Sequence, residues 1–86
     1  MNINELIAII KKKLENNFKI KNIKIEDKSF LHKNHKGNQD GKFHLKIYLK
    51  SNQLKEMNKI ESNKKIFKII DKEIKNSIHS IQILID

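Results

Sequence analysis

KFHLKIYLK, residues 42 to 50, is the stretch that decides the fold of this chain. Apolar and polar residues alternate strictly along it, which is typical of a strand with one face buried. The apolar set is Phe43, Leu45, Ile47 and Leu49. The opposite set is His44, Lys46, Tyr48 and Lys50. The alternation therefore predicts a strand over residues 43–50 whose apolar set faces the core.

A helix and another strand are predicted before this stretch. Residues 2–17 place apolar side chains three and four positions apart, which is the spacing of one helix face; they are Ile3, Leu6, Ile7, Ile10 and Leu14. Asn2, with Glu5 three residues later, fits an N-cap and its reciprocal partner. In IKNIKIED, residues 20–27, Ile23 and Ile25 alternate with polar residues and predict a half-buried strand.

The segment from Asp27 to Gly41 interrupts the apolar pattern and contains both glycines of the chain, so it is predicted to be a long hairpin loop. Residues 53–76 return to helical spacing. Within them Ser62 and Asn63 are interpreted as a break and a new N-cap, which gives two helices joined by a tight turn. The final stretch IHSIQILID predicts a strand, and in it His79 has the same parity as the core-facing isoleucines Ile81, Ile83 and Ile85.

The predicted order is helix, strand, strand, helix, helix, strand. The chain has 86 residues, a length that suits a single domain spanning residues 1–86. We expect an α+β fold of type αββααβ, in which helices cover one face of a three-stranded mixed sheet. A crossover through both helices that returns in parallel should be right-handed.

Composition restricts the possible functions. The net charge is +9, but every basic residue is lysine and the lysines are spread along the whole chain, so the charge is weak evidence for a nucleic-acid partner. No cysteine is present, so metal chemistry would depend on histidine. No window is apolar enough to span a membrane, and Glu5 is out of place in a signal peptide, which favours a cytoplasmic protein. No spacing typical of a catalytic motif occurs, which indicates that the chain is not an enzyme.

The predicted helix pair could dock on DNA through its lysines, among them Lys64, Lys65 and Lys68. Its turn lacks glycine, and no arginine is available to read base edges. A helix with one buried face and one solvated lysine face explains the same residues and is preferred on residue types alone.

The four histidines are the remaining candidates for chemistry. His32 and His35 lie in the loop stretch HKNHKG, His44 opens the second predicted strand and His79 opens the last strand. Neutral imidazole is a common ligand of zinc, copper and iron. Structural zinc sites normally have four closely spaced protein ligands, and four scattered histidines do not provide them. The alternative explanation is that the loop histidines are solvated and that His79 lies at the edge of the core with its ring nitrogens hydrogen-bonded.

Three stretches together resemble the BolA family. They are IEDKSFLHKNHKG, GKFHLKIYLKS and KKIFKIIDKEIKNSIHSIQIL, in that order, and the resemblance extends from about Ile25 to Ile83. The family's first cluster of aspartate, serine and loop histidine is matched by Asp27, Ser29 and His32. Its Ser-His-Phe positions hold Phe43, His44 and Leu45, and its last histidine motif is matched by Ile78, His79, Ser80 and Ile81.

This resemblance implies a fold similar to class II KH domains, and it implies a function. BolA-like proteins pair with monothiol glutaredoxins and share a [2Fe-2S] cluster, in iron-sulfur cluster assembly, trafficking or iron sensing. By this resemblance the ligands here are His79 and His32, with His35 as the alternative to His32, while the glutaredoxin cysteine and glutathione supply the others. The protein would then be a monomer alone and a heterodimer with glutaredoxin.

Two motifs of the family are not matched. The family's Phe-x-Gly reads Leu54, Lys55 and Glu56 here, and its Arg-His-Arg reads Ser62, Asn63 and Lys64. Some bacterial members are described as DNA-binding transcriptional regulators that use this helix-turn-helix-like region. The departures therefore weigh against that role, which stays the alternative to the glutaredoxin partnership.

Overall fold

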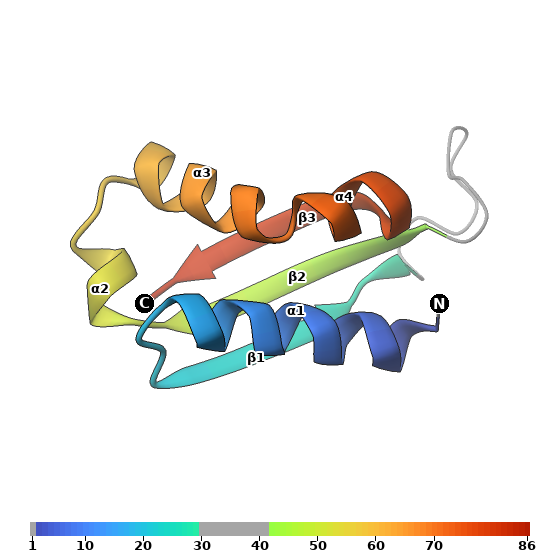
Figure 1. Cartoon of the computed structure of the whole chain (residues 1–86), viewed down its shortest axis with the longest axis horizontal. Coiled ribbons are helices and arrows are strands. Elements are labelled where there is room, and N and C mark those ends of the chain that lie inside the picture. The colour runs from blue at the N-terminus through green and yellow to red at the C-terminus, as the bar shows by residue number, and fades with distance from the viewer. Residues whose placement is uncertain (1, 30–41) are drawn as a thin grey trace.

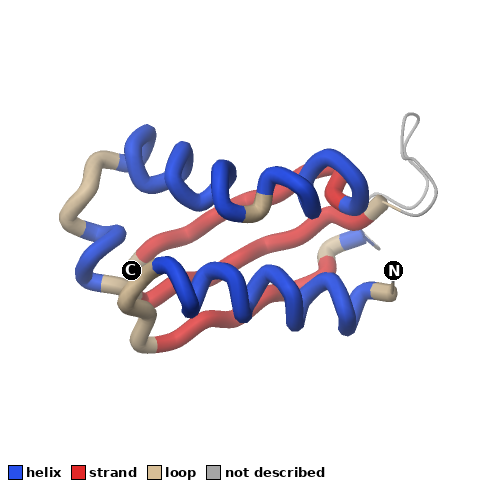
Figure 2. Tube along the Cα trace, in the orientation of Figure 1, coloured by secondary structure: helices blue, strands red, loops and turns tan. Residues whose placement is uncertain are grey.

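Helices cover one face of a three-stranded sheet in the part of the chain that the structure describes (Figure 1, Figure 2). The structure is a computed structural model, and it describes residues 2–29 and 42–86. The elements in chain order are α1 (Ile3–Asn17), β1 (Asn22–Asp27), β2 (Phe43–Lys50), α2 (Asn52–Lys55), α3 (Lys59–Ile69), α4 (Asp71–Ser77) and β3 (Ile78–Ile85).

The sheet has the strand order β1-β2-β3, with β2 at its centre. β1 and β2 are antiparallel, and Ile25 lies opposite Ile47. β2 and β3 are parallel, and Ile47 lies opposite Ile83. The predicted α+β class and the predicted mixed sheet are confirmed.

The core lies between the sheet and the helices. The inward face of α1 contributes Leu6, Ile10 and Leu14, all with no exposed surface. β2 contributes Leu45, Ile47 and Leu49, as its alternation predicts. The remaining buried apolar residues come from the helices after β2 and the start of β3, and they are Leu54, Ile66, Ile70 and Ile78. Burial of each such side chain stabilises the fold by about 1.5–3 kcal/mol.

The Ile47→Ala variant is expected to lower the free energy of unfolding by about 2–5 kcal/mol, because it opens a cavity beside the central strand. Urea denaturation followed by circular dichroism measures this loss. The matched control is Ile60→Ala, because Ile60 is 70% exposed and such surface substitutions change stability by only about 0.5 kcal/mol. Equal losses from the two variants would contradict the described core.

The beginning of α1 follows the prediction. The backbone N–H of Glu5 donates to Oδ1 of Asn2 at 2.8 Å, and the side-chain Nδ2 of Asn2 donates to Oε1 of Glu5 at 3.3 Å. The N-cap and its partner thus satisfy each other.

The prediction of two helices after β2 is wrong, because the described chain forms three. The break does not fall at Ser62 and Asn63, which lie inside α3. The N-cap of α3 is Asn58, whose Oδ1 accepts a hydrogen bond from the Glu61 backbone at 2.8 Å. Ser62 is buried, and its hydroxyl donates to the carbonyl of Lys59 within the first turn of α3.

A partly buried ion pair joins two helices that are far apart in sequence. Lys13 of α1 contacts both carboxylate oxygens of Glu73 on α4, at 2.8 and 2.9 Å. Glu73 is only 5% exposed, whereas Lys13 is 38% exposed. This contact fixes α4, and therefore the beginning of β3, against the N-terminal helix.

The predicted hairpin loop between β1 and β2 lies largely outside the described residues, as do His32 and His35. Within residues 2–29 and 42–86, no helix has the length and apolar character that crossing a membrane requires.

Candidate functional site

Two histidines meet where β2 and β3 begin. His44 is the second residue of β2, and His79 is the second residue of β3. Because the two strands are parallel neighbours, both histidines lie at the same end of the sheet, next to the end of α4 (Figure 1). The centroids of the two imidazole rings are 4.9 Å apart, and their planes are tilted by 59°.

An irregularity in the β2–β3 ladder determines where His79 lies. Phe43 pairs with Ile78 and His44 pairs with Ser80, so His79 is an extra residue in β3. Such a bulge shifts the alternation of the strand by one residue. Ile78 is consequently buried, and His79 is exposed.

The predicted alignment of His79 with the core-facing isoleucines is therefore wrong. Its parity with Ile81, Ile83 and Ile85 would hold only in a regular strand, and the bulge lies between them. Those isoleucines do pack against the core. Exposure of His79 makes its imidazole accessible to a partner molecule.

His44 is buried, with only 4% of its surface exposed. Its Nδ1 lies 2.6 Å from the hydroxyl oxygen of Ser80. Its backbone N–H donates to the hydroxyl oxygen of Ser29 at 3.1 Å, and its carbonyl accepts from the backbone of Lys28 at 2.7 Å. Hydrogen bonds from two other segments thus fix the position of His44 beside the ring of His79.

The residues that precede the loop are held by their own polar contacts. The backbone N–H of Ser29 donates to Oδ1 of Asp27 at 2.9 Å. Lys28 and Glu26 form an ion pair of 2.7 Å. The hydrogen bond from Lys28 lowers the pKa of the Glu26 carboxyl below its ordinary value, and the same bond raises the pKa of the Lys28 ammonium group. Both pKa shifts favour the charged pair. The contacts that hold this segment against His44 are the hydrogen bonds of Lys28 and Ser29 with the His44 backbone.

The described residues contain no group of three or more histidine, cysteine, aspartate or glutamate side chains that could hold a metal ion. Of the three predicted metal ligands, the structure describes His79 alone, since His32 and His35 lie outside its residues. Sequence reasoning did not identify Ser80 as the hydrogen-bond partner of His44. Residue types alone do not reveal this contact, because it depends on the bulge.

The predicted nucleic-acid residues lie on another element. Lys64, Lys65 and Lys68 are all exposed on α3, whose buried residues are Ser62 and Ile66. None of the three contributes to the histidine pair. The residues predicted to bind nucleic acid and the described histidine predicted to bind a metal therefore lie on different elements, α3 and β3.

Comparison with known proteins identifies relatives of this fold. The sequence model for the family described as BolA-like protein matches residues 14–85. A curated relative from Haemophilus influenzae, named "DNA-binding transcriptional regulator BolA", is 27% identical over 73 residues, which are 85% of this chain and 68% of the relative.

Two solved structures from Arabidopsis thaliana are similar to this chain. The BolA domain of SufE1 has a TM-score of 0.78 at 20% identity and is aligned over 100% of this chain and 93% of that domain. BolA1 has a TM-score of 0.76 at 22% identity, over 92% of this chain and 87% of that structure. These similarities support the described arrangement of the helices and the sheet.

Proposed function

Because this chain belongs to the BolA-like protein family, we propose that it is a non-enzymatic partner of a monothiol glutaredoxin and binds a [2Fe-2S] cluster shared with that partner. The process it serves is the assembly or trafficking of iron-sulfur clusters, or the sensing of iron. The observation that supports this proposal is the exposed imidazole of His79, which lies beside a buried histidine held by hydrogen bonds.

The donor set of this chain fits such a cluster. Imidazole nitrogens replace thiolates on one iron of some [2Fe-2S] centres, so a chain without cysteine can serve as a ligand. His79 supplies one nitrogen and His32 of the loop supplies the other, with His35 as the alternative. In this proposal, as the resemblance to the family implies, the remaining ligands come from the glutaredoxin cysteine and glutathione.

His44 has a supporting role in this proposal. The orientation of a metal-binding histidine is commonly fixed by hydrogen bonds and packing around it. The ring of His44, buried and in contact with Ser80, limits the positions that the neighbouring ring of His79 can take. We therefore describe His44 as a positioning residue.

The test is to mix the protein with a monothiol glutaredoxin that carries a [2Fe-2S] cluster and glutathione. The expected result is a changed visible absorption and circular dichroism spectrum, together with a heterodimer in size-exclusion chromatography. Glutaredoxin without its cluster is the control for changes that do not involve the metal. An unaltered spectrum and two separate elution peaks would overturn the proposal.

We also propose nucleic-acid binding as a second candidate function. It is supported by the description of the Haemophilus influenzae relative as a DNA-binding transcriptional regulator and by the exposed lysines on α3. Those lysines contact phosphates in this proposal, since ammonium groups bind them as point charges.

A triple variant, with Lys64, Lys65 and Lys68 replaced by glutamine, tests this second candidate. The slope of log binding constant against log salt concentration is expected to fall in magnitude by about 3, because each lost phosphate contact removes about 0.9. Fluorescence anisotropy with a labelled duplex at several salt concentrations measures the slope. The matched control replaces Lys11, Lys12 and Lys21, which are exposed elsewhere. Equal effects of the two triple variants would mean that net charge alone attracts the duplex.

A further inference from the structure

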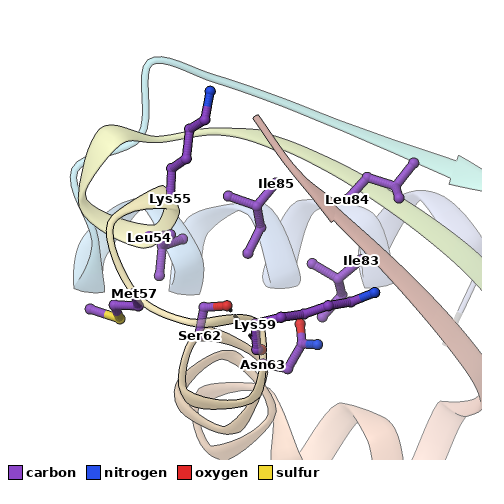
Figure 3. A pocket seen from close by; sticks show the side chains of 9 residues that line it. All are labelled: Leu54, Lys55, Met57, Lys59, Ser62, Asn63, Ile83, Leu84 and Ile85. Carbon is purple, nitrogen blue, oxygen red and sulfur yellow. Dashed lines mark hydrogen bonds between the residues drawn. The ribbon is translucent and has the colours of Figure 1, made fainter.

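A cavity of about 300 Å³ lies at the end of β3 opposite to the histidine pair (Figure 3). Its apolar lining includes Leu54 of α2, Met57 of the α2–α3 connection, and Ile83 and Ile85 of β3. Lys59 and Asn63 of α3 complete the wall that faces the strand. The cavity therefore joins the beginning of α3 to the last residues of β3, and the proposed cluster site does not use it.

β3 is an edge strand of the sheet, and within residues 2–29 and 42–86 it pairs only with β2. Directly after β3, Asp86 donates its N–H to the Leu49 carbonyl and accepts from the Ser51 N–H, so both of its backbone groups point toward β2. The N–H and C=O groups of successive residues in a strand point alternately to its two sides. Ile83 and Ile85 therefore direct their N–H and C=O groups to the outer edge, beside the cavity.

Asn63 provides a second, independent observation. Its Oδ1 atom is buried and has no hydrogen-bond partner among the described residues. Figure 3 shows its side chain reaching from α3 toward Ile83. Buried polar atoms in folded proteins are nearly always paired. A hydrogen-bond donor is therefore expected between α3 and β3.

The charged side chains that line the cavity are both lysine. Lys59 is exposed beside the strand. Lys55 is 64% exposed and lies 3.8 Å from the carboxylate of Asp86, which is itself 87% exposed. A ligand that brings carboxylates to this rim gains charge complementarity. None of the lining side chains is aromatic or arginine, so the cavity lacks the groups that stack on or clamp nucleic-acid bases.

We propose that the outer edge of β3 binds an extended polypeptide segment that carries an apolar side chain with acidic side chains two residues before and two residues after it, so that all three lie on the same face of the added strand. The segment pairs its backbone with Ile83 and Ile85 and becomes an added strand. The apolar side chain enters the cavity, and the acidic side chains on the same face of the segment lie toward Lys55 and Lys59. A donor of the segment reaches Oδ1 of Asn63.

The probe for the first test is a short acetylated peptide with a central valine, a glutamate two residues away on each side of it and threonine at the positions between, added to ¹⁵N-labelled protein. Saturable shifts are expected in the backbone amides of Ile83 and Ile85 and in the side-chain amide of Asn63. The same peptide with lysine in place of glutamate is expected to bind about tenfold more weakly, because its charges repel the rim. Shifts that do not saturate, or that fall on α1 alone, would overturn the proposal.

Two versions of the peptide, methylated on alternate backbone nitrogens in opposite phase, test the strand pairing. One phase blocks the N–H groups that point at β3 and is expected to abolish binding, while the other blocks only N–H groups that point away and leaves binding intact. Equal binding by the two versions would exclude an added strand. Binding of oligothymidylate at these amides without binding of the peptide would assign the cavity to nucleic acid and also overturn the proposal.

Variants of the protein complete the test. Lys59→Glu is expected to weaken peptide binding about tenfold, whereas Lys11→Glu, the same change at an exposed position of α1, is expected to leave it unchanged. Equal weakening by both would attribute the affinity to net charge and contradict the proposal. Because the cavity does not include His79, the His79→Ala variant is expected to bind the peptide normally, so this inference and the proposed cluster function can fail separately.

Discussion

The His79→Ala variant is expected to abolish the spectral change that cluster-loaded glutaredoxin produces with the unaltered protein. His79 is exposed and contributes nothing to the buried core, so the variant should unfold at a free energy within about 0.5 kcal/mol of the original. Removal of the imidazole takes away the one described side chain assigned as a cluster ligand. Visible circular dichroism of the mixture measures the loss, and urea denaturation of the variant alone checks its fold.

The two loop histidines provide the comparison for this result. By the order of the motif, His32→Ala is expected to lose the signal as His79→Ala does, while His35→Ala keeps it. The reverse pattern would assign the ligand role to His35 and retain the proposed function. A full signal from His79→Ala would remove the main support for that function.

The His44→Ala variant is expected to weaken formation of the cluster-bound complex by about 10- to 100-fold, the usual effect of losing a group that orients a metal ligand. His44 is not exposed to a partner, and it acts through its contacts with the ring of His79 and with Ser80. The substitution also removes a buried hydrogen-bonded side chain, which lowers the free energy of unfolding by about 1–3 kcal/mol. Titration of glutaredoxin with the variant, followed by visible circular dichroism, gives the affinity.

The Ser80→Ala variant tests whether His44 positions the ring of His79 or only stabilises the fold. This variant removes only the hydroxyl that lies 2.6 Å from Nδ1 of His44, and because Ser80 is exposed the fold should persist. An altered line shape in the visible spectrum of the Ser80→Ala complex is expected, since the ring of His79 loses part of its support. If Ser80→Ala and His44→Ala both give the original spectrum and affinity, His44 has only a structural role.

The parts of the fold that were predictable are those where local pattern and tertiary environment agree. β2 alternates strictly because one face packs under the helices, so its apolar set could be assigned from sequence. The spacing in α1 and its Asn2–Glu5 cap likewise depend on nearby residues alone. The resemblance to the BolA family, which the family comparison confirms, was also carried by local motifs.

The helix boundaries after β2 were less predictable, because this region contains several residues that can cap a helix. Asn58, followed by Glu61 three residues later, has the pattern of a helix start, and Ser62 and Asn63 are also residue types that cap helices. The structure uses Asn58, and Ser62 is buried with its hydroxyl bonded to its own helix. The choice follows from burial of Ser62, which periodicity does not reveal.

The geometry of the site was predictable only in part. The motif order identified His79 and His44, but their contact depends on the register between two strands that are distant in sequence. A single extra residue decides whether His79 faces the core or the solvent. Because an irregular pairing has no local signature, parity gave the wrong face.

The extra residue in β3 affects two properties of the protein, the regular pairing of its sheet and the accessibility of the His79 imidazole. A bulge interrupts the backbone hydrogen bonds between strands, so a chain without residue 79 could pair Ile78 and Ser80 with consecutive residues of β2 and keep its sheet. Selection for stability alone would tend to delete the residue, whereas selection for an accessible imidazole would keep it. Length variation at this one position is therefore a route by which a protein of this fold could gain or lose the ligand while its core stays the same.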